Sequence, residues 1–242
     1  MSKPLITVIT IVYNDLANVE KTIISVLSQT YQKIEYIVID GESNDGTTEV
    51  VNRYKDRIDK IICEKDFGIY DAMNKGIKKA SGEWVIFMNS NDTFFSNDIV
   101  ENIFKIDYTG FDIIYGNIFV KCKLSKIVKP RNLNEFWKGM PFTHQASFVR
   151  TATHLKYLFD LKYKVSSVYN LFYKMYTDEL KFKYLDLIIA NYDLTGLSHY
   201  SFYWLWDYWR INLKYSKGKL HLVFFKSFRY FLSRVRTNIK RL

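Results

Sequence analysis

The chain has 242 residues, of which 48% are hydrophobic, and this composition excludes an intrinsically disordered protein. Its formal net charge is +10, from 35 Lys and Arg against 25 Asp and Glu. Residues 201–242 carry ten basic residues and one acidic residue, a net charge of +9, which leaves +1 for residues 1–200. This distribution argues against nucleic-acid binding, because a nucleic-acid-binding domain more often spreads positive charge over its folded body.

The first half of the chain alternates strand-like and helix-like segments. Apolar β-rich runs predict strands at residues 5–12, 34–40, 58–63 and 83–88. Helices are predicted after Asp15, which we expect to cap the first one, and then at residues 47–54 and 68–80. The short links favour an α/β fold with a mostly parallel sheet flanked by helices. Beyond residue 111 the pattern is less regular, with a strand predicted at 111–120 and a helix at 165–176.

Several other classes of protein lose support. Cys63 and Cys122 lie outside any metal-ligand spacing, so we expect neither a disulfide framework nor a zinc site. No apolar segment reaches the roughly 18 residues of a membrane span. The sequence contains no phosphate-binding loop, dinucleotide fingerprint or Ser-His-Asp arrangement, which argues against ATPases, dehydrogenases and hydrolases. We predict one domain over residues 1–195, followed by a basic amphipathic helical extension over residues 196–242.

Polar side chains follow three of the predicted strands, at residues 13–14, 40–46 and 89–92. Ligands of parallel sheets bind at the carboxyl ends of the strands, so these side chains are candidates for a binding site. Asp40 could accept hydrogen bonds from a nucleotide base or only from its own turn. The oxygens of residues 89–92 could hold a divalent cation, but a loop of hydrogen-bonding turn residues has the same composition and only Asp92 is charged.

Two further segments contain candidate residues. A helix that begins after Gly68 offers backbone amides to an anion, and Lys75 could add charge, although charged helix residues more often form a solvated face. His144 and Gln145 lie between a proline and an apolar run. A lone histidine there is more often structural than catalytic, so both explanations stay open.

Four motifs occur in a fixed order: VITIVYND, VIDGESNDGT, EKDFGIYDAMNKGI and SGEWVIFMNSND. In this order and spacing they closely resemble the inverting family 2 glycosyltransferases of the GT-A fold, especially bacterial enzymes of surface-polysaccharide synthesis. The resemblance is dense over residues 4–105 and continues more thinly to about residue 176. It implies transfer of a sugar, with inversion, from a nucleoside diphosphate sugar to a glycan or lipid-linked acceptor.

The resemblance also implies the residues of the site. Asp92 would hold a divalent metal, Mn²⁺ or Mg²⁺, whose charge offsets that of the leaving diphosphate. His144 and Gln145 would face the acceptor. The nucleotide-sugar site would comprise Thr10, Tyr13, Asn14, Asp40, Asp66, Gly68, Tyr70, Asp71, Asn74, Lys75, Asn89, Ser90, Asn91 and Asp92.

The chain departs from the family pattern at two places. Asn91 replaces the first acid of the usual Asp-Asp pair, and an amide oxygen is a weaker metal ligand than a carboxylate. Relatives carry an acidic stretch resembling A-A-D-Y-D that supplies the base for the acceptor hydroxyl, whereas here Val168 and Asn170 occupy the acidic positions. The base is therefore unassigned. The alternative is a catalytically impaired relative that binds a nucleotide, a glycan or a partner subunit.

Residues 199–242 combine aromatic and basic side chains. On a helical wheel, apolar residues between 220 and 235 fall on one side, and Lys226, Arg229 and Arg236 fall on the opposite side. This pattern predicts binding to an anionic membrane surface, and we expect a cytoplasmic protein that is peripheral on the inner face of the membrane. Packing of the same aromatic side chains on the body is the alternative, and the two are compatible.

Overall fold

The computed structural model describes residues 3–121, 125–193 and 202–216, with residues 218, 221, 222 and 224. Every strand and helix predicted for residues 5–88 is present, with bounds that differ by a few residues. In chain order the elements are β1 (Ile6–Val12), α1 (Val19–Leu27), β2 (Ile34–Asp40), α2 (Thr47–Asn52), β3 (Lys60–Cys63), α3 (Ile69–Lys79), β4 (Trp84–Phe87), β5 (Thr93–Phe94), α4 (Ile99–Phe104), β6 (Ile113–Lys121), β7 (Lys126–Val128), η1 (Leu133–Lys138), η2 (His144–Ala146), β8 (Ser147–Arg150), α5 (Thr151–Lys156), α6 (Ser167–Thr177), β9 (Phe182–Asp193) and α7 (Phe202–Tyr215).

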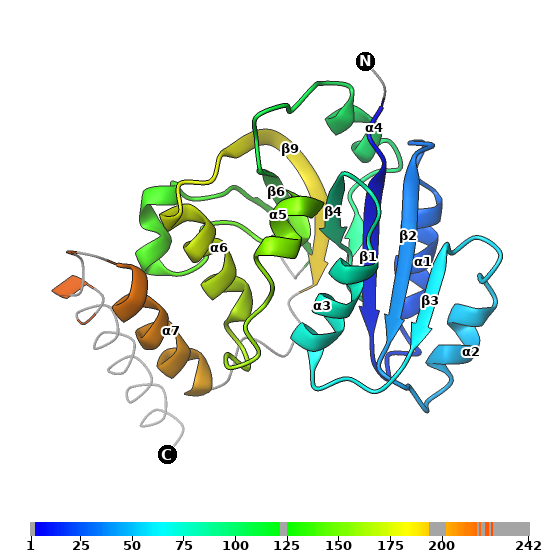
Figure 1. The fold of residues 1–242 in the computed structure, drawn as a ribbon. Coiled ribbons are helices and arrows are strands. Elements are labelled where there is room, and N and C mark those ends of the chain that lie inside the picture. Colours follow the sequence, from blue (N-terminus) through cyan, green and yellow to red (C-terminus); the bar gives the residue numbers. More distant parts are fainter. Residues whose placement is uncertain are drawn as a thin grey trace.

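One curled, mixed sheet runs through the molecule in the order β3-β2-β1-β4-β8-β6-β9-β5, and β7 pairs with β6 (Figure 1). The first four strands are parallel to one another, while β8 is antiparallel to both of its neighbours. Alternate residues of β1 face two separate cores, because successive side chains of a strand point to opposite faces of the sheet. This architecture confirms the predicted α/β fold of the GT-A type.

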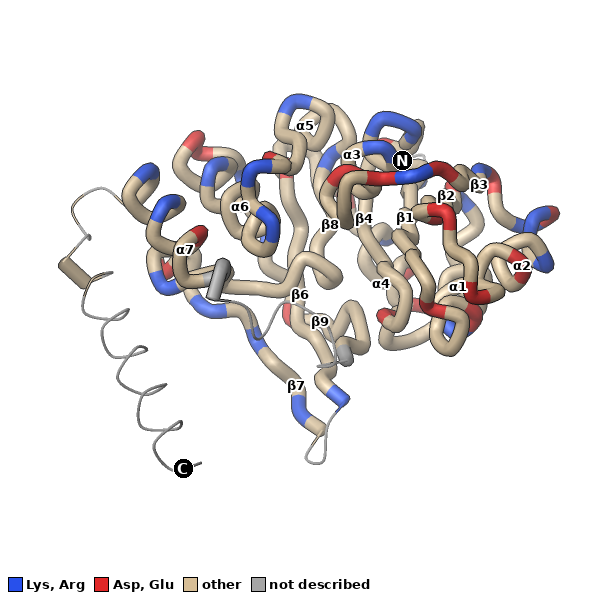
Figure 2. The backbone as a smooth tube through the Cα atoms, turned by 90° about the horizontal axis from the view of Figure 1, so that it is seen from below, with Lys and Arg blue, Asp and Glu red and all other residues tan. Residues whose placement is uncertain are grey.

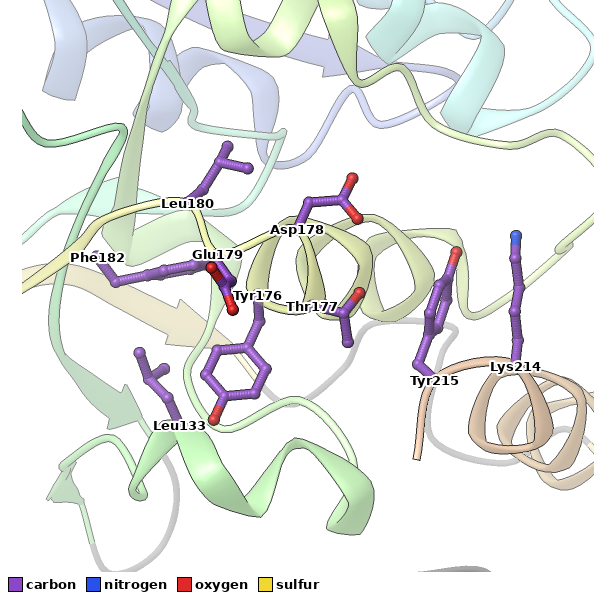
Figure 3. A pocket seen from close by; sticks show the side chains of 9 residues that line it. All are labelled: Leu133, Tyr176, Thr177, Asp178, Glu179, Leu180, Phe182, Lys214 and Tyr215. Atoms are coloured by element: carbon purple, nitrogen blue, oxygen red, sulfur yellow. The ribbon is translucent and has the colours of Figure 1, made fainter. Parts of the chain in front are cut away.

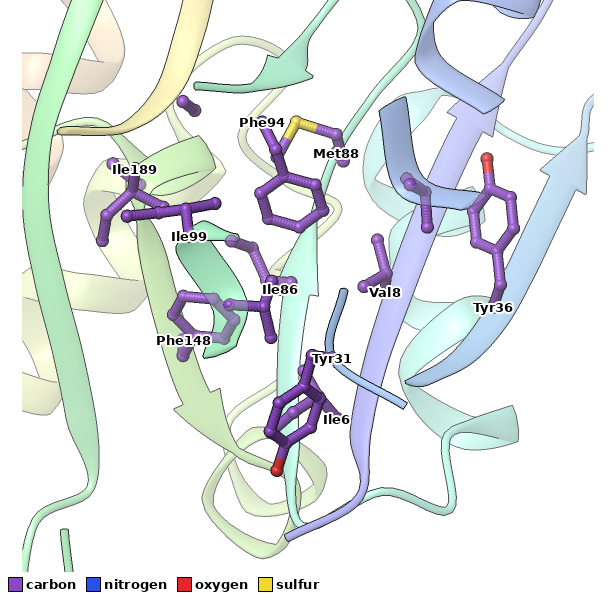
Figure 4. Packing of buried hydrophobic residues seen from close by; sticks show 14 of the residues in the cluster. Ile6, Val8, Tyr31, Tyr36, Ile86, Met88, Phe94, Ile99, Phe148 and Ile189 are labelled. Carbon is purple, nitrogen blue, oxygen red and sulfur yellow. The ribbon is translucent and has the colours of Figure 1, made fainter. Parts of the chain in front are cut away.

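The core on the α1 side of the sheet is built from side chains of neighbouring strands (Figure 4). Ile6 and Val8 of β1 lie between Tyr36 of β2 and Ile86 of β4, and all four are almost completely buried. Burial of each such side chain contributes about 1.5–3 kcal/mol to folding. This packing stabilises the central strands, and the strands in turn fix the positions of the loops at their ends.

The start of α1 differs from the prediction. Asn18, and not Asp15, is the residue that precedes the helix. The carboxylate of Asp15 instead accepts hydrogen bonds from Asn18 Nδ2 at 2.6 Å and from the hydroxyl of Ser90 at 2.7 Å. Asp15 therefore ties the loop after β1 to the loop after β4, which is a different task from capping.

Helix α7 packs against α6, although its sequence belongs to the predicted extension. Tyr208 and Ile211 are buried in the second core, and the Tyr208 hydroxyl donates to the carbonyl of Trp137 at 2.7 Å. On the opposite side, Trp206 and Leu213 are exposed. The boundary at 195/196 stays a prediction. Most of the aromatic wheel beyond residue 216 lies outside the described residues.

Candidate functional site

The carboxyl ends of β1, β2 and β4 meet at one edge of the sheet, which lies at the bottom of the view in Figure 1. The loops that follow are joined by hydrogen bonds. The Asn14 N–H donates to Ser43 Oγ at 2.8 Å, and the Asn44 N–H donates to Asn14 Oδ1 at 2.8 Å. Together with the bond from Ser90 to Asp15, these contacts bring the three predicted polar clusters together.

Tyr13 and Asp66 approach each other across Gly41. A Cβ atom added at Gly41 would lie 2.6 Å from Asp66 Oδ2 and 3.2 Å from Tyr13 Cδ2, so only glycine fits without displacing them. The Tyr13 side chain is 63% exposed, and Asp66 Oδ1 accepts a hydrogen bond from the Gly68 N–H at 2.8 Å. An exposed aromatic ring can stack on a nucleotide base, and a carboxylate beside it can accept hydrogen bonds from the hydroxyl groups of a sugar.

Asp40 and Thr10 do not reach the surface of this site. Asp40 is 0% exposed, and its carboxylate accepts hydrogen bonds from the Ser43 N–H, the Ser43 hydroxyl and the Thr48 hydroxyl. Asp40 thus holds its own turn, and its implied contact with a nucleotide base stays a prediction. Thr10 is equally buried and donates to the carbonyl of Met88 at 2.8 Å. The implied role of Thr10 in lining the pocket stays a prediction.

The start of α3 is shaped by Gly68, whose φ of 109° lies in a region that favours glycine. Asp71 in the first turn accepts a hydrogen bond from the Phe67 N–H at 3.1 Å. Lys75 is paired with Glu64 at 3.0 Å and with Asp71 at 3.6 Å, and it also donates to the carbonyl of Lys65. The charge of Lys75 is therefore balanced by acids of its own segment.

Asn74 and Tyr70 join α3 to the second half of the chain. Asn74 exchanges two hydrogen bonds of 2.9 Å with the backbone of Phe159. The Tyr70 hydroxyl donates to the carbonyl of Val165 at 2.6 Å, and burial raises the pKa of this phenol to about 12. Both side chains position the segment before α6, and their implied place in the nucleotide-sugar site stays a prediction.

The loop after β4 contains the motif for which the resemblance implies a metal. The amide oxygen of Asn89 is buried without a hydrogen-bond partner among the described residues, whereas Asn91 Oδ1 accepts a hydrogen bond from Nζ of Lys21 in α1. Asp92 is buried, and its backbone carbonyl accepts a hydrogen bond from Thr22 at 2.8 Å. Sequence reasoning missed Lys21, because a single lysine in an exposed helix turn resembles any solvated residue.

A divalent cation would meet few protein ligands and a competing ammonium group in this loop. Mg²⁺ beside a substrate diphosphate is usually held by one or two carboxylates, and the diphosphate and water supply its other oxygen ligands. Residues 89–92 offer one carboxylate, that of Asp92, and the ammonium of Lys21 already occupies an oxygen of Asn91. Within the described parts of the chain, no three His, Cys, Asp or Glu side chains are grouped as metal ligands.

The expected acceptor side carries buried polar atoms that lack partners. His144 and Gln145 form the short turn η2 before β8. His144 Nε2 and Gln145 Oε1 are buried without a hydrogen bond to any described residue, as is Oδ1 of Asn170 in α6. Burial, together with His154, lowers the pKa of His144 to about 4, so the ring is neutral near pH 7. Unpartnered buried polar groups are costly, and a bound hydroxyl-rich molecule could satisfy them.

A hollow of about 750 Å³ opens elsewhere, at the C-terminal end of α6 (Figure 3). None of the residues implied by the resemblance lines it. Its acid Asp178 accepts a hydrogen bond from the Tyr157 hydroxyl at 2.9 Å. The candidate site is therefore the sheet edge, where the predicted residues gather, and not this hollow. The hollow is lined by Leu133, Tyr176, Thr177, Asp178, Glu179, Leu180, Phe182, Lys214 and Tyr215.

Sequence comparison finds glycosyltransferases similar to this chain. A glycosyltransferase of Mycobacterium bovis (strain BCG / Pasteur 1173P2), named for PGL/p-HBAD biosynthesis, is 24% identical over 207 residues, which cover 82% of this chain and 81% of the relative. An uncharacterized glycosyltransferase of Mycobacterium tuberculosis strain H37Rv is 42% identical over 159 residues, which cover 61% of this chain and 59% of the relative.

Solved structures share the fold. TarS 1–349 of S. aureus, in complex with UDP, matches with a TM-score of 0.66 and 17% identity, covering 86% of this chain and 64% of that chain. The mannosyltransferase PcManGT of Pyrobaculum calidifontis, in complex with GDP-Man and Mn²⁺, matches with a TM-score of 0.64 and 16% identity, covering 95% of this chain and 65% of that chain. This chain spans less than two thirds of either solved chain. The model of glycosyl transferase family 2 matches residues 7–172, well over half of the sequence, and the chain therefore belongs to that family.

Proposed function

We propose that this protein transfers a sugar, with inversion, from a nucleoside diphosphate sugar to a glycan or lipid-linked acceptor in the synthesis of a surface polysaccharide. The observation that carries the proposal is the convergence of the loops after β1, β2 and β4 at one sheet edge. There Tyr13 and Asp66 flank Gly41, a surface suited to a nucleoside. Family membership supports the reaction class, and the site supports the donor class.

In this proposal each part of the edge has one task. The nucleoside lies against Tyr13 and Asp66, and the diphosphate extends toward the loop after β4. The acceptor hydroxyl, on the side of His144 and Gln145, attacks the anomeric carbon opposite the diphosphate. The new C–O bond forms as the bond to the diphosphate breaks, and the acceptor loses its proton to a base. The electron pair leaves with the diphosphate, whose growing charge must be stabilised.

A second candidate function is a binding subunit without turnover. One observation favours it: the first turn of α6, which carries Val168 and Asn170, contains no acidic residue. Asn170 cannot accept a proton usefully near neutral pH. Consumption of a donor sugar by the purified protein would eliminate this second candidate.

The first experiment measures donor binding and donor consumption together. UDP- and GDP-sugars are titrated into the protein by calorimetry, and released nucleoside diphosphate is then assayed with glycan and lipid-linked acceptors. Tyr13→Ala should weaken donor binding about 5- to 150-fold, because stacking on one base contributes about 1–3 kcal/mol. Ile106→Ala, an exposed apolar side chain after α4, is the matched control and should leave binding unchanged. Binding without release would favour the second candidate, and equal binding by both variants would contradict the proposed nucleoside position.

We further propose that residues 199–242 attach the protein to the inner face of an anionic membrane. The net charge of +9 over residues 201–242 and the exposed Trp206 and Leu213 of α7 support this attachment. Basic residues also appear on α6, on α7 and at β7, on the side away from α2 (Figure 2). No helix of the described residues is long and apolar enough to cross a bilayer.

Membrane attachment is tested by deletion after Ser216, because α7 itself is packed into the body and must be kept. Deletion of residues 217–242 removes eight basic residues and no acidic one. The truncated chain should lose binding to vesicles that contain anionic lipid, and the full chain should lose it in high salt. Unchanged vesicle binding by the truncated chain would refute the role of this segment.

A further inference from the structure

Lys21 places a positive charge at the motif for which the resemblance implies a metal. It lies in the first turn of α1, and its Nζ donates a hydrogen bond to Oδ1 of Asn91 in the loop after β4. Asn91 has a φ of 80°, so the loop presents this amide in a left-handed turn. The two residues are 70 positions apart in the sequence and are joined only by the fold.

A second lysine lines a cavity shared with Lys21. Lys121, at the carboxyl end of β6, lines a small cavity together with Lys21 and Asn91. The cavity measures about 30 Å³, and none of its lining residues is acidic; they are Lys21, Asn91, Thr93, Lys121, Asn191 and Tyr192. Both lysines are exposed, so their charged ends remain accessible to a ligand from solvent. Asn91 thus shares this cavity with two lysines.

We propose that Lys21, assisted by Lys121, neutralises the donor diphosphate, so that donor binding does not require a divalent cation. The inference rests on the proposed donor site and names the counter-charge used there. A lysine ammonium is an effective phosphate ligand, acting as a compact point charge. When the sugar–diphosphate bond breaks, its electron pair stays on the diphosphate oxygen, and the ammonium groups stabilise that added charge.

The same arrangement explains why Asn is tolerated at position 91. A carboxylate there would pair with Lys21 and remove its charge from the diphosphate, whereas an amide holds the ammonium by a hydrogen bond without neutralising it. A divalent cation would meet like-charge repulsion from Lys21 and would find a single carboxylate, Asp92, in the loop. The amide and the lysine therefore form one functional unit.

The test is calorimetric titration of the full chain with UDP and GDP, in EDTA and then in Mn²⁺. The wild-type protein should bind at least one of them in EDTA, with an affinity that changes less than about threefold in Mn²⁺. Lys21→Met should weaken binding in EDTA about tenfold or more, because it removes a charge-assisted hydrogen bond to the diphosphate. Lys105→Met is the matched control, because Lys105 also donates to an asparagine amide, Asn102 Oδ1 at 3.4 Å, but lies by α4 at the opposite edge (Figure 1).

A double variant, Lys21→Met with Asn91→Asp, introduces the first acid of the family's Asp-Asp pair and removes the ammonium group of Lys21. It should bind the nucleotide in Mn²⁺ and lose binding in EDTA, which is the opposite of the wild-type behaviour. Thermal unfolding of each variant confirms that it is folded, as expected for the exposed Lys21 and Lys105 and the half-buried Asn91. Wild-type binding that appears only with Mn²⁺, or a Lys21→Met variant that binds like Lys105→Met, would overturn the inference and leave the proposed donor site standing. Failure of the folded wild-type chain to bind any nucleotide in either condition would overturn both.

Discussion

Helix α7 should contribute directly to the stability of the folded body, and Ile211→Ala tests this. Ile211 is 0% exposed and belongs to the same core as Tyr208 and the aromatic side chains of α6. Replacing a buried isoleucine by alanine costs about 2–5 kcal/mol, because it loses apolar contacts and leaves a cavity. For a domain of this size, a loss of about 3 kcal/mol lowers the Tm by about 6–12 °C.

The assay is thermal unfolding of the full chain, followed by far-ultraviolet circular dichroism. The control is Leu213→Ala, two residues further along the same helix, where the side chain is 61% exposed. A surface substitution of this kind changes stability by no more than about 0.5 kcal/mol. If Ile211→Ala and Leu213→Ala unfold at the same temperature as the wild-type protein, α7 is not part of the folded body. A truncation that also removes α7 could then be used to test membrane attachment.

The remaining predictions concern an acid and a phenol. Burial raises the pKa of Glu35, but hydrogen bonds from Lys60 and from neighbouring hydroxyl and amide groups outweigh this effect. They lower its pKa to about 2. Its folded pKa is lowered, so its stabilisation is present above about pH 4.5 and is lost as the pH falls toward 2. Glu35→Gln should therefore flatten the acid limb of a plot of unfolding free energy against pH. An unchanged acid limb would contradict this. Tyr70→Phe removes the hydrogen bond to Val165 and should lower the free energy of unfolding in denaturant by about 1 kcal/mol. Donor affinity should stay unchanged. Weakened donor binding at unchanged stability would instead place Tyr70 at the ligand.

The first half of the fold was predictable because its signals are local. Apolar runs of strand length and helix-spaced residues alternate over residues 5–88, and each segment packs on its sequence neighbours. The long strand β9 was not predicted. Its sequence includes Lys183 and Asp186, and its partner β6 lies about 70 residues earlier, so no local pattern reports the pairing. Non-local strand pairing of this kind depends on the assembled sheet.

The sequence predicts where the candidate site lies. It predicts less well what each side chain of the site contacts. Residues at strand ends gather at one edge by topology alone, as Tyr13 and Asn14 do. Whether a polar group faces a ligand or the backbone depends on three-dimensional contacts, and Thr10 and Asn74 bind the backbone of distant segments. The contact of Lys21 with the loop after β4 has the same origin, because it joins two elements that only the folded sheet brings together.

The central claim is that the sheet edge binds a nucleoside diphosphate sugar. The most direct measurement is calorimetric titration of the folded full chain with UDP- and GDP-sugars, in parallel with Tyr13→Ala. We predict saturable binding of at least one donor by the wild-type chain and a marked loss of affinity in the Tyr13 variant, whose ring is exposed beside Gly41. Absence of binding to every donor, with and without Mn²⁺, would contradict the account.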